Sequence, residues 1–120
     1  MAFNPFTTQL ISNASMATSI TSTPQHVQFQ DNIGVQLNWT GTPTGTFEVQ
    51  VSTDYVLQNL LVVNPGNWIT LPLNPAITAT GSPDVAYVDL NQLSAMYVRV
   101  VYTAVSGTGT LNCYIAAKGV

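Results

Sequence analysis

The chain has 120 residues, of which only 6% are charged, and its formal net charge is −3. A chain of this length forms a single domain with a hydrophobic core of its own, so it needs no disulfide or metal to fold. Its acidic balance argues against nucleic acid as a partner, because Arg99 and Lys118 are its only cations and phosphate binding requires a basic patch.

An ordinary soluble domain carries about 25% charged residues, whereas here Thr, Asn, Gln and Ser take their place throughout the chain. A neutral polar surface is poorly protected against association, so we expect that much of it packs against other subunits or that the protein resides outside the crowded cytosol. The N-terminal sequence lacks the basic region and continuous apolar core of a signal peptide. No apolar run approaches the roughly 20 residues that span a bilayer. We therefore expect a product of the cytoplasm with no membrane partner.

Residues 1–23 are rich in Ser, Thr, Asn and Gln, and their apolar side chains follow no clean period. They predict an extended N-terminal arm, with one short strand near residues 14–21, followed by a β-sandwich domain over residues 24–120. Such an arm is either a frayed terminus or a segment that docks on a neighbour. Phe3 and Phe6 make docking as good an explanation as fraying, because large apolar side chains are seldom left in water.

We expect a short strand near residues 25–30. Two segments in which apolar and polar side chains strictly alternate come after it. Apolar and polar side chains alternate over residues 35–40 and again over residues 46–53, with the glycine-flanked loop of residues 41–45 between them. Period-two alternation on both sides of a turn predicts a half-buried antiparallel hairpin. Residues 54–63 fit either a helical turn or a buried strand, and we expect a loop that leads into a strand.

The C-terminal third predicts a second hairpin. After short strands near residues 68–73, 77–79 and 86–90, residues 97–103 and 111–116 form two β-rich segments around Gly107 and Gly109. One face supplies the candidate core residues Val98, Val100, Leu111, Cys113 and Ile115. The other face carries Tyr97, Arg99 and Tyr114, which we expect to form a contact surface if that face is outward.

Seven or eight short strands separated by turns, with no helix, predict an all-β fold built as a single antiparallel β-sandwich. Immunoglobulin-like and jelly-roll topologies both fit this pattern. We expect no catalytic residue, cofactor or metal site. The carboxylates are scattered along the chain, His26 has no second ligand at metal-binding spacing, and the lone Cys113 suits a buried thiol.

Three stretches resemble small virion proteins of tailed bacteriophages. They are VQLNWTGTPTGTFEVQVSTD (residues 35–54), GNWITLP (residues 66–72) and YVRVVYTAVSGTGTLNCYIAAKG (residues 97–119), with SGTGTLN as the most specific part. The resemblance implies a β-sandwich structural protein of the virion with no catalytic residues. It does not assign any position of this chain to a site.

The resemblance does not say which part of the particle the protein belongs to. We expect a capsid decoration (cement) protein, because the chain is small, low in charge and has an N-terminal arm. Such a protein would be made in the host cytoplasm, reside in the virion and bind the major capsid protein or other virion proteins, with further copies of itself as lattice neighbours. A tail or portal-vertex component is an alternative of the same class. A surface module that binds carbohydrate or a receptor, with Trp68 and the tyrosines as stacking groups, is an alternative of another class.

Overall fold

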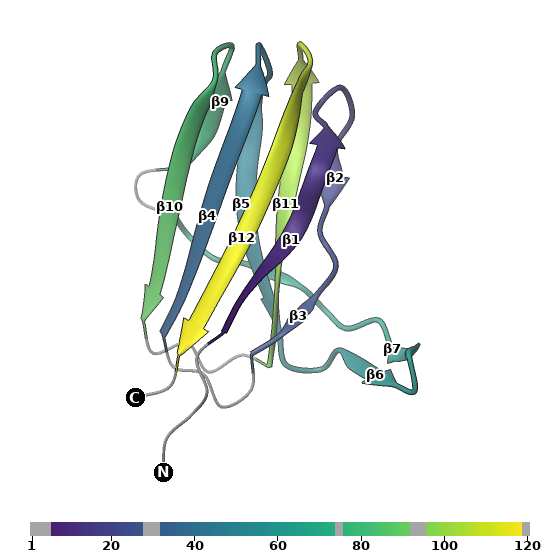
Figure 1. The fold of residues 1–120 in the computed structure, drawn as a ribbon. Coiled ribbons are helices and arrows are strands. Elements are labelled where there is room, and N and C mark those ends of the chain that lie inside the picture. The colour runs from purple at the N-terminus through teal and green to yellow at the C-terminus, as the bar shows by residue number, and fades with distance from the viewer. Residues whose placement is uncertain (1–5, 28–31, 74–75, 92–95, 119–120) are drawn as a thin grey trace.

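The structure is a computed structural model that describes residues 6–27, 32–73, 76–91 and 96–118, and these form an all-β sandwich of two antiparallel sheets (Figure 1). Sheet A contains, in spatial order, β1 (Phe6–Ser15), β12 (Gly109–Lys118), β4 (Asn32–Gly41) and β10 (Asp84–Asn91). Sheet B is built on β11 (Tyr97–Ser106) and β5 (Thr44–Ser52) and is flanked by β2 (Ile20–Thr21), β3 (Gln25–His26), β8 (Ile69–Thr70) and β9 (Thr78–Thr80). Outside both sheets, β6 (Val56–Gln58) and β7 (Leu61–Asn64) form a hairpin of their own.

The strand order identifies the topology as a jelly roll. Both β2 and β3 pair with β11, and both β8 and β9 pair with β5, so each couple acts as one interrupted edge strand. If β2 and β3 are counted together as the second strand, β8 and β9 together as the fifth, and β6 and β7 are left out, the two sheets contain eight strands. Numbered anew along the chain, these lie in the order 1-8-3-6 in sheet A and 2-7-4-5 in sheet B. Every connection but one then crosses from one sheet to the other, as in a double-sheet jelly roll. This result selects between the two topologies that the sequence pattern allowed.

The hydrophobic core lies between the sheets, where alternate side chains of each strand point inward. The predicted core positions are confirmed as buried: Val98, Val100, Leu111, Cys113 and Ile115. An aromatic row joins the sheets, since the Trp39 ring lies 5.0 Å from Phe47 and the Phe47 ring lies 4.8 Å from Tyr102. These pairs add to the burial of large apolar area and fix how the sheets face each other.

Both predicted hairpins are wrong in their pairing, although their strands exist. β4 pairs with β12 and β10, and β5 pairs with β11, so the two arms of the first expected hairpin lie in different sheets. β11 and β12 are separated in the same way. Each of the two turns is therefore an arch between sheets. The inward-facing side chains of consecutive strands meet across the core instead of side by side in one sheet.

The two arches pack against each other at one end of the sandwich. The Thr42 N–H donates a hydrogen bond of 2.8 Å to the Thr108 carbonyl oxygen. Gly107 adopts a φ of 79°, and a Cβ there would collide with the Thr42 carbonyl oxygen, so only glycine fits both the conformation and the space. Gly107 and Gly109, where a Cβ would collide with the Thr42 and Thr40 carbonyl oxygens, thus allow the two arches to touch.

The expected arm over residues 1–23 is part of the sandwich from Phe6 onward. β1 pairs with β12 along its length, with irregularities near Ile11, and β2 pairs with β11. Ile11 and Met16 are buried in the core, and this burial explains why the segment joins the sheets. Its apolar residues showed no clean period because the register shifts within β1 and the chain then crosses to the other sheet.

Candidate interaction surface

The polar groups of the described residues give little indication of metal or thiol chemistry. No group of three or more His, Cys, Asp or Glu side chains within them could hold a metal ion, and they contain no helix long and apolar enough to cross a membrane. Cys113 is fully buried, and burial raises the pKa of its thiol to about 12, so it is not an activated nucleophile. The features that stand out on the described surface are apolar ones that could contact another molecule.

The β6–β7 hairpin is the most apolar exposed feature of the described chain. It projects from one end of the sandwich, away from both sheets (Figure 1). Leu60 at its tip is 91% exposed and Leu61 is 70% exposed, and Leu57, Val62 and Val63 are also exposed. Single exposed apolar residues are ordinary, whereas a contiguous group on a protrusion marks an interaction site.

The tip has the conformation of a two-residue hairpin turn. Asn59 and Leu60 connect β6 to β7, and both have positive φ angles, 50° and 65°. Asn tolerates this left-handed region well, but Leu occupies it rarely, and the turn is of the kind that matches the twist of the flanking strands. The strained residue is thus the one whose aliphatic side chain is presented to solvent.

A hydrogen-bonded clamp closes the neck of the hairpin. The Asp54 carboxylate accepts hydrogen bonds from the Asn67 backbone N–H (2.8 Å), the Asn67 side-chain amide (2.8 Å) and the Ser52 hydroxyl (2.7 Å). These bonds, led by the Asn67 backbone N–H, lower the pKa of Asp54 to about 2. The clamp ties the outgoing chain to the returning chain, so the hairpin is held on the sandwich from both sides.

An aromatic cluster on sheet B supports the same neck. The Arg99 guanidinium carbon lies 4.2 Å from the centroid of the Trp68 ring, and the Trp68 indole N–H donates to the Pro65 carbonyl oxygen at 3.0 Å. Tyr55 packs against Trp68 on one side and edge-on against Tyr97 on the other, at 5.6 Å and 4.7 Å between centroids. Cation–π and edge-to-face contacts of this kind fix the ring positions.

The sequence-predicted interface residues are not brought together. Tyr97 and Arg99 lie on the outer face of sheet B, whereas Tyr114 alternates with buried Cys113 and Ile115 and so lies on the outer face of sheet A. The expectation of one shared contact face fails because β11 and β12 belong to different sheets. Phe3 lies outside the described residues. Phe6 begins β1, paired with Ala117, and its side chain lies outside what the structure describes.

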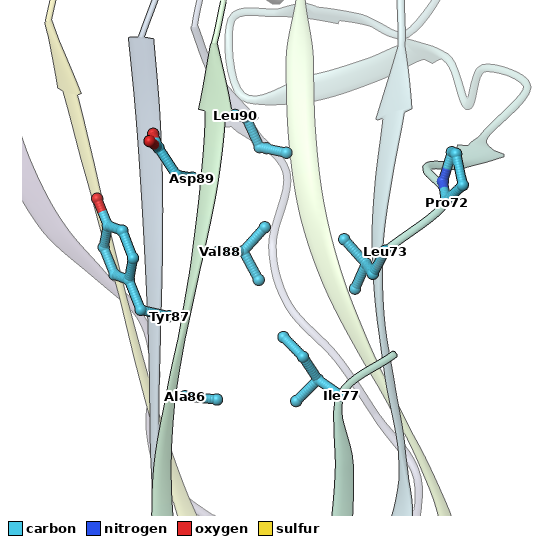
Figure 2. A pocket seen from close by; sticks show the side chains of 8 residues that line it. All are labelled: Pro72, Leu73, Ile77, Ala86, Tyr87, Val88, Asp89 and Leu90. Carbon is cyan, nitrogen blue, oxygen red and sulfur yellow. The ribbon is translucent and has the colours of Figure 1, made fainter. Parts of the chain in front are cut away.

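A second apolar feature is a groove at the open edge of the sandwich (Figure 2). Its volume is about 650 Å³, and it lies between β10 on one side and Pro72, Leu73 and Ile77 on the other. Val88 and Leu90 of β10 point into it from one side, and Leu73 and Ile77 point into it from the other. The groove opens into the hydrophobic core at the edge of the sandwich formed by β10 of sheet A and β8 of sheet B.

Sequence reasoning missed the hairpin because its residues look like core. The run Leu60–Val63 is aliphatic throughout, which is typical of a buried strand. The available signal was the brevity of this run between Asn59 and Asn64, since four residues flanked closely by turn formers suit a hairpin arm better than a core strand.

No family model and no curated protein matches the sequence. Among solved structures, one similar chain comes from a structure of infectious bursal disease virus, Gx strain, with a TM-score of 0.52 and 9% sequence identity. The alignment covers 97% of this chain and 32% of the viral chain, so this chain spans about a third of the length of that neighbour. At this identity the likeness is one of fold, and it agrees with the all-β sandwich described above.

Proposed function

We propose that the protein is a non-enzymatic structural protein of a virus particle, most simply a capsid decoration protein of a tailed bacteriophage. It would be made in the host cytoplasm and would bind the major capsid protein or other virion proteins. Three features support this proposal: a neutral polar surface, a jelly-roll fold of the class found in viral capsid domains, and the likeness to a chain from a virus structure. Fold alone does not assign function, so the exposed surface of the protein is the stronger support for a role in the virion.

The observation that carries the proposal is the clamped apolar hairpin. A protein that acts alone in solution gains nothing from presenting Leu60 and Leu61 on a rigid protrusion, whereas a lattice component gains a contact. Fully burying a Leu or Val side chain is worth about 1.5–3 kcal/mol. Covering these two leucines would contribute at most about 3–6 kcal/mol before the entropic cost of association. Repetition over many equivalent sites would strengthen a shell substantially.

Binding to particles tests the proposal directly. Particles that lack the protein are mixed with wild-type protein or with the double variant Leu60→Gln/Leu61→Gln, and bound protein is measured after sedimentation. We expect at least tenfold weaker binding for the double variant. Val105→Gln is the matched control, because Val105 is as exposed as Leu61 (70%) but lies toward the arch end of β11. Wild-type protein that fails to bind particles would falsify the proposal.

Copy number separates the decoration protein from its nearest alternative. Quantitative mass spectrometry of purified particles gives the number of copies relative to the major capsid protein. Hundreds of copies support decoration, and a handful of copies support a tail or portal-vertex component instead. The hairpin argument applies to both locations, so the count is needed in addition to the binding test.

A carbohydrate-binding module is a second candidate, favoured by polar groups beside Trp68. The Arg99 Nε–H donates to the Gln50 side-chain oxygen at 2.8 Å, and the Gln50 amide donates to the Thr70 hydroxyl oxygen at 3.2 Å. The Thr70 hydroxyl in turn donates to Glu48 at 3.4 Å. Planar polar side chains next to an aromatic ring can bind the hydroxyl groups and the apolar face of a sugar.

Glycan-array binding decides whether this second candidate stands. A carbohydrate-binding module should lose its glycan binding with Trp68→Ala and keep it with Tyr114→Ala. Tyr114 is the control because it is a half-buried aromatic residue on the other sheet. Circular dichroism confirms that both variants are folded. An array with no binding by wild-type protein removes this candidate and leaves the structural role unaffected.

A further inference from the structure

We propose that the β6–β7 hairpin of one copy docks on the β10 edge and the adjoining groove of a second copy, so that copies associate head to tail. This inference rests on the proposed function and deepens it, because it names the partner of the hairpin.

The hairpin has the features of an inserting element. β7 is extended and all four of its residues are exposed, including Leu61, Val62 and Val63. Residues 55–68 carry no charged side chain. A two-stranded sheet is marginal in water by itself, and a third strand with an apolar face stabilises it. The hairpin therefore gains both backbone hydrogen bonds and apolar burial when a further strand pairs with it.

The receiving surface has the complementary features. β10 is the last strand of sheet A and pairs, within the described residues, only with β4. It is eight residues long, and Val85 and Tyr87 on its outward side are 66% and 64% exposed. A long, exposed apolar edge strand is a template for pairing with another chain. The groove next to it offers the half-buried Leu73, Ile77 and Leu90 to aliphatic side chains that enter from that edge, whereas Val88 belongs to the buried core (Figure 2).

The position of the two features requires that the occupant belong to another molecule. The neck of the hairpin lies over β11, where Trp68 meets Arg99, and its tip projects from the side of the sandwich opposite β10 (Figure 1). A chain cannot therefore place its own hairpin in its own groove. A second copy suits the site, because each copy carries both the uncharged β6–β7 hairpin and, among the described residues, a β10 edge with no second partner strand.

Docking of unlike surfaces makes the contact heterologous. Each copy then has one free hairpin and one free edge, and association continues into a ring or a lattice instead of stopping at a dimer. One two-stranded hairpin is a small contact element, so we expect a single contact to be weak and repetition over many copies to make it persistent. We expect association that depends on protein concentration, not a fixed dimer.

Cross-linking of two single-cysteine variants tests this geometry in solution. Purified Leu60→Cys protein and Tyr87→Cys protein are mixed with a short thiol-specific cross-linker, and covalent dimers are measured on a denaturing gel. Cys113 is fully buried and gives a low background, which wild-type protein checks. We expect at least tenfold more dimer in the mixture than in either variant alone. Equal dimer in the Leu60→Cys sample alone indicates hairpin-to-hairpin contact and overturns the proposal, as does the absence of dimer in the mixture.

Sedimentation velocity gives an independent readout without cysteines. We expect the average mass of wild-type protein and of Val105→Gln to rise with concentration, while Leu60→Gln/Leu61→Gln stays monomeric. Wild-type protein that is monomeric up to millimolar concentration overturns head-to-tail docking. If it still binds particles, the decoration proposal stands and only the named partner is wrong. If the protein associates head to tail but does not bind particles, the docking stands and the decoration role is wrong.

Discussion

The two ends of β5 lead into connections of opposite character. At its start, a short arch crosses from β4 with Pro43 fully buried, and it packs on the second arch through the hydrogen bond from Thr42 to Thr108. At its end, the chain leaves the sandwich for residues 53–68 and places Leu60 in solvent. The arch before β5 therefore helps to specify the fold, whereas the β6–β7 excursion after β5 presents an apolar surface to solvent. Mutations should therefore affect stability at the first and association at the second.

The largest expected contrast is between two leucines. Leu111→Ala removes a fully buried side chain of β12 and leaves a cavity, so we expect the free energy of unfolding to fall by about 2–5 kcal/mol. Leu60→Ala at the hairpin tip removes no core contact, and we expect a change within about 0.5 kcal/mol. Urea denaturation followed by tryptophan fluorescence measures both. Equal losses would show that the hairpin belongs to the cooperative core.

A second contrast tests the contact between the arches. Gly107→Ala places a Cβ against the Thr42 carbonyl oxygen in addition to the cost of positive φ, and we expect a loss of about 2–4 kcal/mol. Gly81→Ala is the control, because Gly81 also has positive φ (89°) but its Cβ would meet only the Thr44 hydroxyl oxygen, at 3.9 Å. We expect about 1 kcal/mol there. Similar thermal unfolding of the two variants would show that the arches do not constrain each other.

The sequence predicts which side chains face the core but not which strands pair. Alternation places Val98 and Leu111 on inward faces in either arrangement, since side chains of a strand alternate whether its neighbour follows in a hairpin or lies across the core. The pattern therefore supports an all-β sandwich and leaves its topology open. Tyr97 and Tyr114 were assigned to one face only because β11 and β12 were assumed to pair.

The sequence indicates the turn at Asn59 but not the exposure of the hairpin, for a related reason. Leu60 and Leu61 are aliphatic, and composition alone cannot separate an aliphatic residue that packs inside its own chain from one that awaits a partner. The clamp depends on Asp54 meeting Asn67, a contact across the whole excursion that no local pattern encodes. Trp68 and Arg99 meet by the same long-range route, which explains why Arg99 was identified without its role at the neck.

The smallest expected effect concerns the clamp itself and is a change of order, not of global stability. Because the folded pKa of Asp54 is about 2, below its ordinary value of 3.8, the clamp keeps its full strength above about pH 4 and loses it as the pH falls through 2. Asp54→Asn should loosen the hairpin at every pH, since an amide cannot accept all three bonds as a carboxylate does. Amide hydrogen exchange over residues 55–66 measures this: we expect faster exchange in wild type at pH 2 than at pH 5 once the intrinsic rates are divided out, and a smaller pH effect in Asp54→Asn. The strands of sheet A are the control, and their exchange should not change with pH in this way. Loss of protection in the hairpin and in sheet A together would show that the hairpin neck unfolds with the core and not as a separate local unit.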